Sequence, residues 1–216
     1  MEVDNSISGQ YNSEIKGKIT MEHSEKNLLY PVFLRLDKLK ILIVGAGEVG
    51  EEKMNFLLKS SPNAHITIVA TWVGEAVNEI IAAFPESDIK INIKEVEETD
   101  VIGQDIVVAA TCFEEVNKNV HRWAKKHGKL INVADTPDLC DFYMGSIVSK
   151  GDLKIAISTN GKSPTFSKRL RQYLESILDD DTSDLIENLH KIRDKMDVDF
   201  KAKVRELNKL TEKLLE

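Results

Sequence analysis

The segment that decides the fold is Lys40-Ile-Leu-Ile-Val-Gly-Ala-Gly-Glu-Val-Gly50, an apolar run that leads directly into G-x-G-x-x-G. The run predicts a buried strand, and the pattern from Glu48 onward predicts a helix. Gly45 permits the tight turn, Gly47 lets the backbone approach a pyrophosphate, and Gly50 lets the helix pack close to the strand. The helix N-terminus adds unpaired N–H groups and a positive dipole end. The segment predicts a dinucleotide-binding turn, and the alternative is a glycine-rich turn that binds nothing.

The acidic residue that usually bonds the ribose hydroxyls about 20 positions downstream is missing. The second apolar run, His65-Ile-Thr-Ile-Val69, ends instead in Ala70-Thr71-Trp72. Thr71 offers a hydroxyl to a ribose, and Trp72 offers a ring that can cover an adenine. No arginine stands there for a 2′-phosphate, so we expect NAD as the cofactor in preference to NADP.

The composition is that of a globular protein with one good core and a modest second unit. The chain has 216 residues, 42% of them hydrophobic, and its net charge of −7 argues against a nucleic-acid partner. No apolar run approaches the roughly 20 residues that cross a bilayer, and the first residues do not resemble a signal peptide. Cys112 and Cys140 have no metal-ligand spacing. We expect reduced thiols and a cytoplasmic protein without a membrane partner.

Strand and helix patterns alternate through residues 28–145, which predicts a Rossmann-like, doubly wound parallel sheet of the α/β class. The expected strands are Lys40–Val44, His65–Val69, Ile89–Lys94, Ile106–Ala110 and Leu130–Val133. The expected helices are Glu48–Lys59, Gly74–Ala83 and Glu115–His127. Ligands of such sheets bind at the carboxyl ends of the strands. The polar residues 1–27 are expected to be a disordered leader.

After the sheet the pattern changes, and residues 146–179 are expected to form a small α+β region for dimerisation and substrate binding. Two short strands are expected there, at Ser146–Val148 and Lys154–Ser158. A helix should follow, with Ser163 as its N-cap and Pro164 in its first position.

Residues 180–216 are expected to form a C-terminal helical region. Asp179-Asp-Asp181 should end the preceding helix, and one final helix then carries an apolar stripe from Leu185 to Leu214. A stripe of this length favours packing on a partner subunit or on the other helix.

Asp135 is the best-placed acid or base, because it directly follows the fifth expected strand in Asn132-Val-Ala-Asp-Thr-Pro-Asp138. The alternative is that this aspartate only caps a turn. Residues 154–174 contain five basic side chains and no acid. On an acidic protein this favours a polyanionic ligand, and the alternative is an ordinary solvated helix face. The histidines have no ligand spacing, so we expect no protein metal site.

Several stretches, taken in order over residues 29–178, carry a family resemblance. They are Tyr30-Pro-Val-Phe-Leu34, Gly45-Ala-Gly-Glu-Val-Gly-Glu-Glu-Lys53, Ala109-Ala-Thr111 with Val116-Asn117, Asn132-Val-Ala-Asp135, Phe142, Ala156-Ile-Ser-Thr-Asn-Gly-Lys-Ser-Pro164 and Lys168-Arg-Leu-Arg171. Together they resemble the siroheme synthase family of precorrin-2 dehydrogenases, some of which also insert iron into sirohydrochlorin. The chain departs from the family where Ala46 replaces a glycine, where Gly50 replaces a small alanine, and where Tyr143-Met-Gly145 replaces an apolar residue and proline.

The resemblance implies NAD-dependent oxidation of precorrin-2 to sirohydrochlorin in siroheme biosynthesis, by a homodimer, with ferrous iron as a further expected substrate. Besides Gly45 and Gly47, the implied cofactor-binding residues are Glu48, Val49, Thr71, Trp72 and Thr111. Asp135 falls on the family's catalytic aspartate. The implied substrate-binding residues are Ser158, Asn160, Lys162, Ser163, Arg169 and Arg171. The eight carboxylates of the tetrapyrrole suit the basic stretch, and its own nitrogens would hold iron.

Two alternatives stay open. In the first, the protein is a dehydrogenase only, and another protein inserts the iron. In the second, it is a regulatory NAD-sensing protein whose C-terminal helices act as a dimer switch. A sensor has no need of a stretch that binds a polycarboxylate, so this stretch distinguishes the last alternative from an enzyme.

Overall fold

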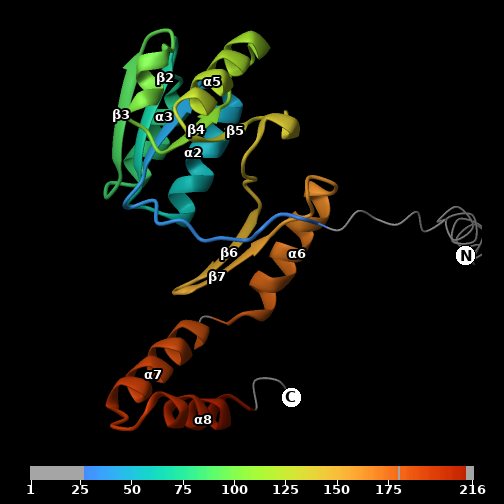
Figure 1. The fold of residues 1–216 in the computed structure, drawn as a ribbon. Helices are drawn as coiled ribbons and strands as arrows, with labels where there is room; N and C mark the ends of the chain where they lie inside the picture. Colours follow the sequence, from blue (N-terminus) through green and yellow to red (C-terminus); the bar gives the residue numbers. More distant parts are fainter. Residues whose placement is uncertain (1–26, 180, 213–216) are drawn as a thin grey trace, which may run out of the picture. The chain divides into compact units, whose positions relative to one another are not determined.

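The computed structural model describes residues 27–179 and 181–212 (Figure 1). Contacts divide the chain into two units, residues 1–30 and 31–216, and every helix and strand below belongs to the second unit. The expected leader lies almost wholly outside the described residues. None of the described helices is long and apolar enough to cross a membrane.

Five parallel strands form the main sheet in the order β3-β2-β1-β4-β5 (Figure 1). They are β1 (Lys40–Val44), β2 (His65–Ala70), β3 (Asp88–Ile93), β4 (Ile106–Ala109) and β5 (Leu130–Val133). All five were predicted to within one residue at each end. The central strands β1 and β4 are buried on both faces, which is why they are continuous apolar runs in the sequence.

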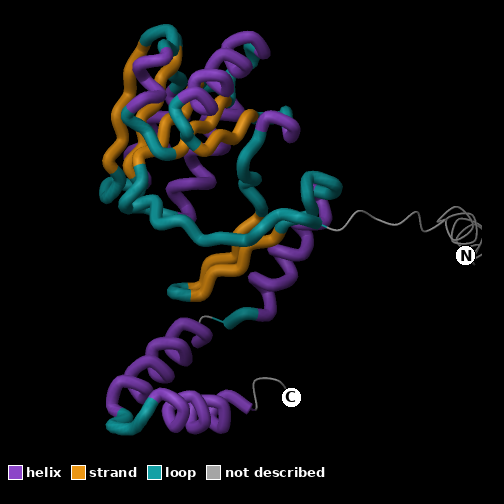
Figure 2. The backbone as a smooth tube through the Cα atoms, viewed as in Figure 1, coloured by secondary structure: helices purple, strands orange, loops and turns teal. Residues whose placement is uncertain are grey.

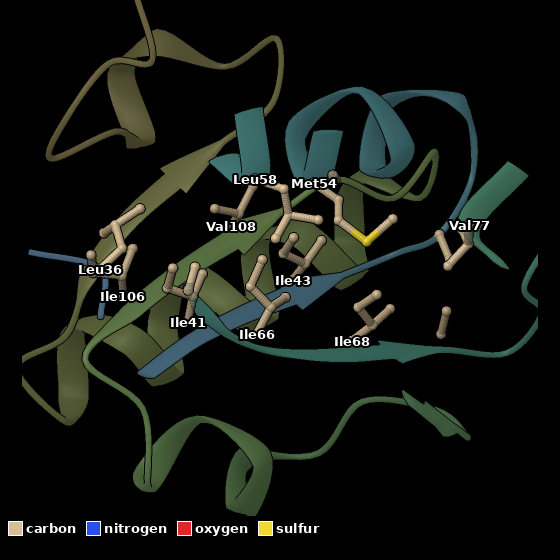
Figure 3. Close-up of a cluster of buried hydrophobic side chains, with 14 residues drawn as sticks. Leu36, Ile41, Ile43, Met54, Leu58, Ile66, Ile68, Val77, Ile106 and Val108 are labelled. Atoms are coloured by element: carbon tan, nitrogen blue, oxygen red, sulfur yellow. The ribbon is translucent and has the colours of Figure 1, made fainter. Parts of the chain in front are cut away.

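Helices cover both faces of this sheet. They are α2 (Glu48–Ser60), α3 (Glu75–Ala83), α4 (Glu98–Ile102) and α5 (Glu114–Lys126). On one face, Met54 and Leu58 of α2 pack with Ile43 and Ile66 in a fully buried cluster (Figure 3). A second cluster on the other face includes residues of α4 and α5. The predicted doubly wound α/β architecture is confirmed.

A small antiparallel hairpin follows the sheet (Figure 2). It consists of β6 (Ser146–Lys150) and β7 (Leu153–Ile157), and helix α6 (Pro164–Ile177) packs on β6. The predicted N-cap is confirmed, because the Ser163 hydroxyl accepts the N–H of Phe166 at 3.2 Å.

The segment in which the sequence departs from its family runs close to β7. A Cβ atom on Gly145 would lie 2.4 Å from the carbonyl oxygen of Ile157, so a glycine is needed there. The neighbouring Phe142 and Met144 pack against the core cluster that Figure 3 shows. The chain therefore leaves β5 and reaches β6 without losing contact with the core.

The predicted single final helix is wrong, because the structure has two helices there. They are α7 (Asp181–Lys195) and α8 (Phe200–Thr211). Asp199 begins the second helix as an N-cap whose carboxylate accepts the N–H of Ala202 at 3.0 Å. The apolar spacing continues across residues 196–199, so the stripe alone did not reveal the break. Leu214, the last residue of the predicted stripe, lies outside the described residues.

Candidate functional site

The three glycines after β1 have different surroundings. Gly45 has a φ of +101°, and a Cβ there would lie 2.6 Å from the carbonyl oxygen of Ala110. A Cβ on Gly50 would lie 2.1 Å from the carbonyl oxygen of Gly45, so α2 packs directly on the turn. A Cβ on Gly47 would meet no atom of the described residues within 4 Å. Gly45 and Gly50 are therefore needed by the fold, whereas Gly47 opens onto free space.

The start of α2 suits a phosphate group. Gly47 is its N-cap, and no side chain of the described chain caps this helix. Its first N–H groups therefore have no side-chain acceptor, and the helix dipole favours an anion there. The turn lies at the carboxyl ends of β1 and β4, where the strand order reverses and where doubly wound sheets bind ligands. These residues fit the pyrophosphate of NAD.

The loop after β4 lies beside the same turn. The Thr111 methyl group is 3.1 Å from the position of a Cβ on Gly45. Asn117, which is 8% exposed, holds this loop: its amide oxygen accepts the Thr111 hydroxyl at 2.7 Å, and its amide nitrogen donates to the Thr111 carbonyl at 2.9 Å. Gly45, Gly47 and Thr111 of the predicted cofactor residues therefore surround one turn.

The remaining predicted cofactor residues lie on the elements next to this turn. Glu48 and Val49 open α2, and Thr71 and Trp72 follow β2. The Trp72 side chain is 66% exposed, and its ring would be 2.8 Å from a Cβ on Gly74. A large exposed ring beside the cofactor turn is available to cover a base, as the sequence predicts.

A cavity of about 1000 Å³ lies at the carboxyl end of β5. Its walls come from the segment after β5, one face of α2, the β6–β7 hairpin and α6. Asp135 lines this cavity. Ala134 donates its N–H to the carbonyl of Ala109 at 2.9 Å, so the start of this turn is bonded to the end of β4.

Asp135 has an unusual backbone and a free side chain. Its φ of 55° lies in the left-handed region, which costs a non-glycine residue about 1 to 2 kcal/mol. Within the described part of the chain, its carboxylate takes part in no hydrogen bond or ion pair. The turn is closed by the backbone, through the N–H of Thr136 to the carbonyl of Val133 at 3.2 Å. This geometry gives no support to the turn-capping alternative, and strained residues of this kind cluster at functional sites.

Cys140 stabilises the turn that contains Asp135 through hydrogen bonds to its backbone. Its sulfur lies 3.2 Å from both the nitrogen and the carbonyl oxygen of Val133, and 3.4 Å from the carbonyl oxygen of Thr136. Burial raises the pKa of the Cys140 thiol, although the hydrogen bond from the Val133 backbone opposes this shift. The protonated thiol can therefore donate to these carbonyl groups at neutral pH. No pattern in the sequence indicated this role for Cys140.

Asp141 bonds the next part of the same segment to β5. Its N–H donates to the carbonyl of Ile131 at 2.7 Å, and its carboxylate accepts the N–H of Ile131 at 3.2 Å. Lys125 of α5 donates to the same carboxylate at 2.6 Å. Both oxygens of the Asp141 carboxylate thus bond to other parts of the described chain, in contrast to the carboxylate of Asp135.

The predicted substrate residues divide into two groups. Ser158 and Arg171 line the cavity. The other four, which do not line it, are Asn160, Lys162, Ser163 and Arg169. Ser163 is instead the N-cap of α6. Arg171 already has an anionic partner, because Glu175 accepts from its guanidinium at 2.6 Å.

Other basic residues were missed as site residues. Lys168 of α6 lines the cavity, and so do Lys53 and Lys59 of α2. Lys154, from the basic stretch, instead donates to the carbonyl and the hydroxyl of Ser60 and so links β7 to α2. A lysine on a helix is usually a solvated side chain, so only the fold reveals which lysines converge.

A smaller cavity of about 620 Å³ lies at the opposite edge of the sheet. It is lined by Lys40, His65 and Asp88, which begin β1, β2 and β3. Parallel sheets bind their ligands at the carboxyl ends of strands, so the larger cavity is the candidate site. Among the described residues, no group of three histidine, cysteine or acidic side chains is placed to hold a metal ion.

Two family models match the chain in order. Residues 32–146 match a family described as "Putative NAD(P)-binding", and residues 150–177 match one described as "Sirohaem biosynthesis protein central". The first covers the main sheet with its turn and Asp135. The second covers β7 and all of α6, which line the cavity from the other side.

Curated relatives point the same way. The chain is 34% identical over 173 residues to the siroheme synthase of Pseudoalteromonas atlantica. The aligned residues make up 80% of this chain and 36% of the relative. It is also 38% identical over 148 residues to the siroheme synthase of Methylococcus capsulatus. That alignment covers 68% of this chain and 30% of the relative. The chain therefore spans about a third of the length of the curated relatives it matches.

A solved structure matches most of both chains. The protein named "SirC, precorrin-2 dehydrogenase" is 29% identical, with a TM-score of 0.66 over 84% of this chain and 89% of that one. Most of the fold described above thus occurs in a protein of similar length.

Proposed function

The chain belongs to the siroheme synthase family, and from this premise we propose that it oxidises precorrin-2 to sirohydrochlorin with NAD. The observation that carries the proposal is Asp135. This is an exposed carboxylate with no partner among the described residues, in a left-handed turn that lines the cavity and adjoins the cofactor turn. Such a group is free to accept a proton from a bound substrate.

NAD, when bound, accepts the hydride that leaves the substrate. The chain's contribution is to hold its pyrophosphate at Gly45, Gly47 and the start of α2, with Thr111 beside the turn. The end of β2 offers Thr71 to the ribose and contains no arginine for a 2′-phosphate. We therefore expect NAD to bind more tightly than NADP.

Asp135 acts as the general base in this proposal. Oxidation of precorrin-2 removes two electrons and two protons, and the hydride carries both electrons and one proton. The second proton passes to the Asp135 carboxylate and then to solvent, which reaches the side chain because it is exposed. Cys140 and the backbone hold the turn, so the carboxylate is not needed to maintain it.

The cavity also suits a substrate with many carboxylates. Four cationic side chains (Lys53, Lys59, Lys168 and Arg171) and three anionic ones (Glu52, Asp135 and Glu175) line it, although the whole chain has a net charge of −7. The cavity is thus locally more positive than the protein, which favours an anionic ligand. The volume of about 1000 Å³ is at the upper end of the range for small-molecule sites.

We propose further that the protein is a homodimer. Phe166, Tyr173 and Ile177 are each more than half exposed, and they lie on one face of α6. The β6–β7 sheet beside it has only two strands, an arrangement that is marginally stable without further packing. A second copy that covers this face would bury the apolar surface. A monomer by light scattering at micromolar concentration would contradict this assembly.

The reaction is tested by anaerobic incubation of the protein with precorrin-2 and NAD. Formation of NADH together with sirohydrochlorin supports a dehydrogenase. Ferrous iron is then added to the same mixture. Appearance of siroheme faster than in a protein-free control supports the expected iron insertion, and an unchanged rate leaves a dehydrogenase alone. Tight NAD binding without any turnover would instead favour the NAD-sensing alternative.

A cytoplasmic location is part of the same proposal. Cys112 and Cys140 are both free thiols, and NAD-dependent biosynthesis of this kind needs no oxidising compartment.

A further inference from the structure

Helix α2 presents one continuous face to the cavity. Glu52, Lys53, Phe56, Lys59 and Ser60 line it, and their spacing places them within about 60° of Phe56 around the helix axis. The opposite side of the helix carries Met54 and Leu58, which are buried in the core (Figure 3). The cavity face is therefore fixed in orientation by the core packing of the same helix.

The charges on this face are only partly paired. The Lys53 ammonium lies 3.3 Å from the Glu52 carboxylate, and its side chain is 23% exposed whereas that of Glu52 is 72% exposed. Within the described part of the chain, Lys59 makes no hydrogen bond or ion pair, and neither does Lys168 on the opposite wall. On α6, Arg171 is paired with Glu175. Unpaired cations thus stand on both walls of one cavity.

Lys53 lines the same cavity as Asp135 and Cys140. Its positive charge lowers the pKa of the Cys140 thiol, which opposes the effect of burial, and the Cys140 sulfur contacts Val133 and Thr136 on either side of Asp135. A substrate group held by Lys53 would therefore lie near the proposed base. Phe56, which is half-buried and lies between the two lysines on the helix face, offers an apolar contact to the substrate ring.

We propose that α2 is the second substrate-binding wall, in which Lys53 and Lys59 bind carboxylates of the tetrapyrrole while Phe56 contacts its ring. This inference rests on the proposed function for the identity of the ligand. One helix then serves both ligands, with its N-terminus at the cofactor pyrophosphate and its lateral face at the substrate. Lys154 of β7, bonded to Ser60, fixes this wall to the hairpin.

The test measures binding of uroporphyrin, a tetrapyrrole with eight carboxylates, to the full chain by fluorescence quenching. Lys53→Gln and Lys59→Gln should each weaken binding about tenfold, because each removes a charge-assisted hydrogen bond. The loss should shrink as salt is raised. For coproporphyrin, which has four carboxylates, the difference in affinity between the variants and wild type should be smaller. In turnover, KM for precorrin-2 should rise while kcat changes little.

Three controls separate this role from a structural one. Lys53→Arg keeps the charge and should retain most of the affinity. Lys201→Gln removes an exposed charge on α8, outside the cavity, and should have no effect. NAD affinity and the melting temperature should stay at wild-type values in all variants.

The proposal is overturned if the double variant Lys53→Gln/Lys59→Gln binds uroporphyrin like wild type. It is also overturned if Lys201→Gln causes the same loss, or if NAD affinity falls in parallel, because the lysines would then act through bulk charge or serve the cofactor. Failure of the proposed function looks different. Wild-type protein would then bind uroporphyrin through the two lysines and yet produce no NADH from precorrin-2.

Discussion

Asp135 allows catalysis and stability to be separated by substitution at one position. Its φ of 55° is a conformation that costs an L-residue about 1 to 2 kcal/mol and costs glycine almost nothing. Asp135→Gly relieves that strain, but the unfolded chain gains entropy worth about 0.4 to 1 kcal/mol. The relief is the larger of the two effects, so we expect a stability between that of wild type and about 1.5 kcal/mol above it. Asp135→Asn should match wild type because asparagine tolerates this conformation, and Asp135→Ala should lose about 1 kcal/mol.

Activity should follow a different order. All three variants lack the carboxylate, and loss of a positioned general base typically lowers the rate by about 10² to 10⁴. This equals about 3 to 5 kcal/mol of transition-state stabilisation. The rate is measured as NADH formation from precorrin-2 under anaerobic conditions, and stability as the free energy of unfolding in urea. NAD binding should be intact throughout.

Two outcomes would refute this reasoning. Asp135→Asn with a rate within a fewfold of wild type would show that the carboxylate accepts no essential proton. A rate that followed stability across the three variants, highest for glycine and lowest for alanine, would show that Asp135 matters only through the turn. Asp138→Asn and Asp141→Asn serve as controls: Asp138 does not line the cavity, and the Asp141 carboxylate already binds Lys125 and β5.

Three further predictions concern the cofactor turn and the thiol. Gly47→Val should abolish NAD binding by calorimetry while lowering stability by at most about 1 kcal/mol, because a Cβ there would lie within 4 Å of no atom of the described residues; retained binding would contradict the pyrophosphate site. Gly50→Ala should destabilise the fold by about 1 to 3 kcal/mol, because its Cβ would lie 2.1 Å from a backbone oxygen; an unchanged melting temperature would count against this packing. Cys140 should react with iodoacetamide only at a higher pH than exposed Cys112, because burial raises its pKa; equal pH profiles would disprove this. That raised pKa stabilises the fold below the thiol's ordinary value near 9.0, and the contribution should be lost as pH rises through the folded pKa.

The sheet was predictable because its strands obey simple rules. A strand buried on both faces, such as β1 or β4, must be apolar throughout, and the turns between strands and helices expose polar residues. Helix α4 was missed because it has only five residues and too short an apolar pattern. Its visible signal was the capping box of Glu97 and Asp100, in which each side chain accepts the other residue's N–H.

The cofactor turn was predictable from sequence for a related reason. The roles of Gly45 and Gly50 depend on contacts with nearby residues of one strand-turn-helix unit, and such contacts follow from spacing. The substrate residues depend on long-range packing instead. Lys53 and Lys168 are 115 positions apart in the chain and yet line one cavity. Arg169 and Lys162, which the basic stretch suggested, lie outside it because a helix or a turn directs neighbours to different sides.

The fold connects the cofactor site and the substrate site, and the reaction requires this connection. A hydride transfer requires the cofactor and the substrate to be held in one geometry, and small displacements lower the rate strongly. Here the cofactor turn, the base and both substrate walls are joined to one another by short connections: Gly50 packs on Gly45, Ala134 bonds to the end of β4, and Lys154 bonds to the end of α2. The polycarboxylate substrate supplies many charges at the edge of its ring. Lysines on two separate walls can use those charges to fix the ring's orientation, whereas a single basic helix would leave it free to tilt. The α2 lysines would then supply binding energy on one of these walls, and substitutions that preserve the base but remove these charges should raise KM for precorrin-2 before they lower kcat.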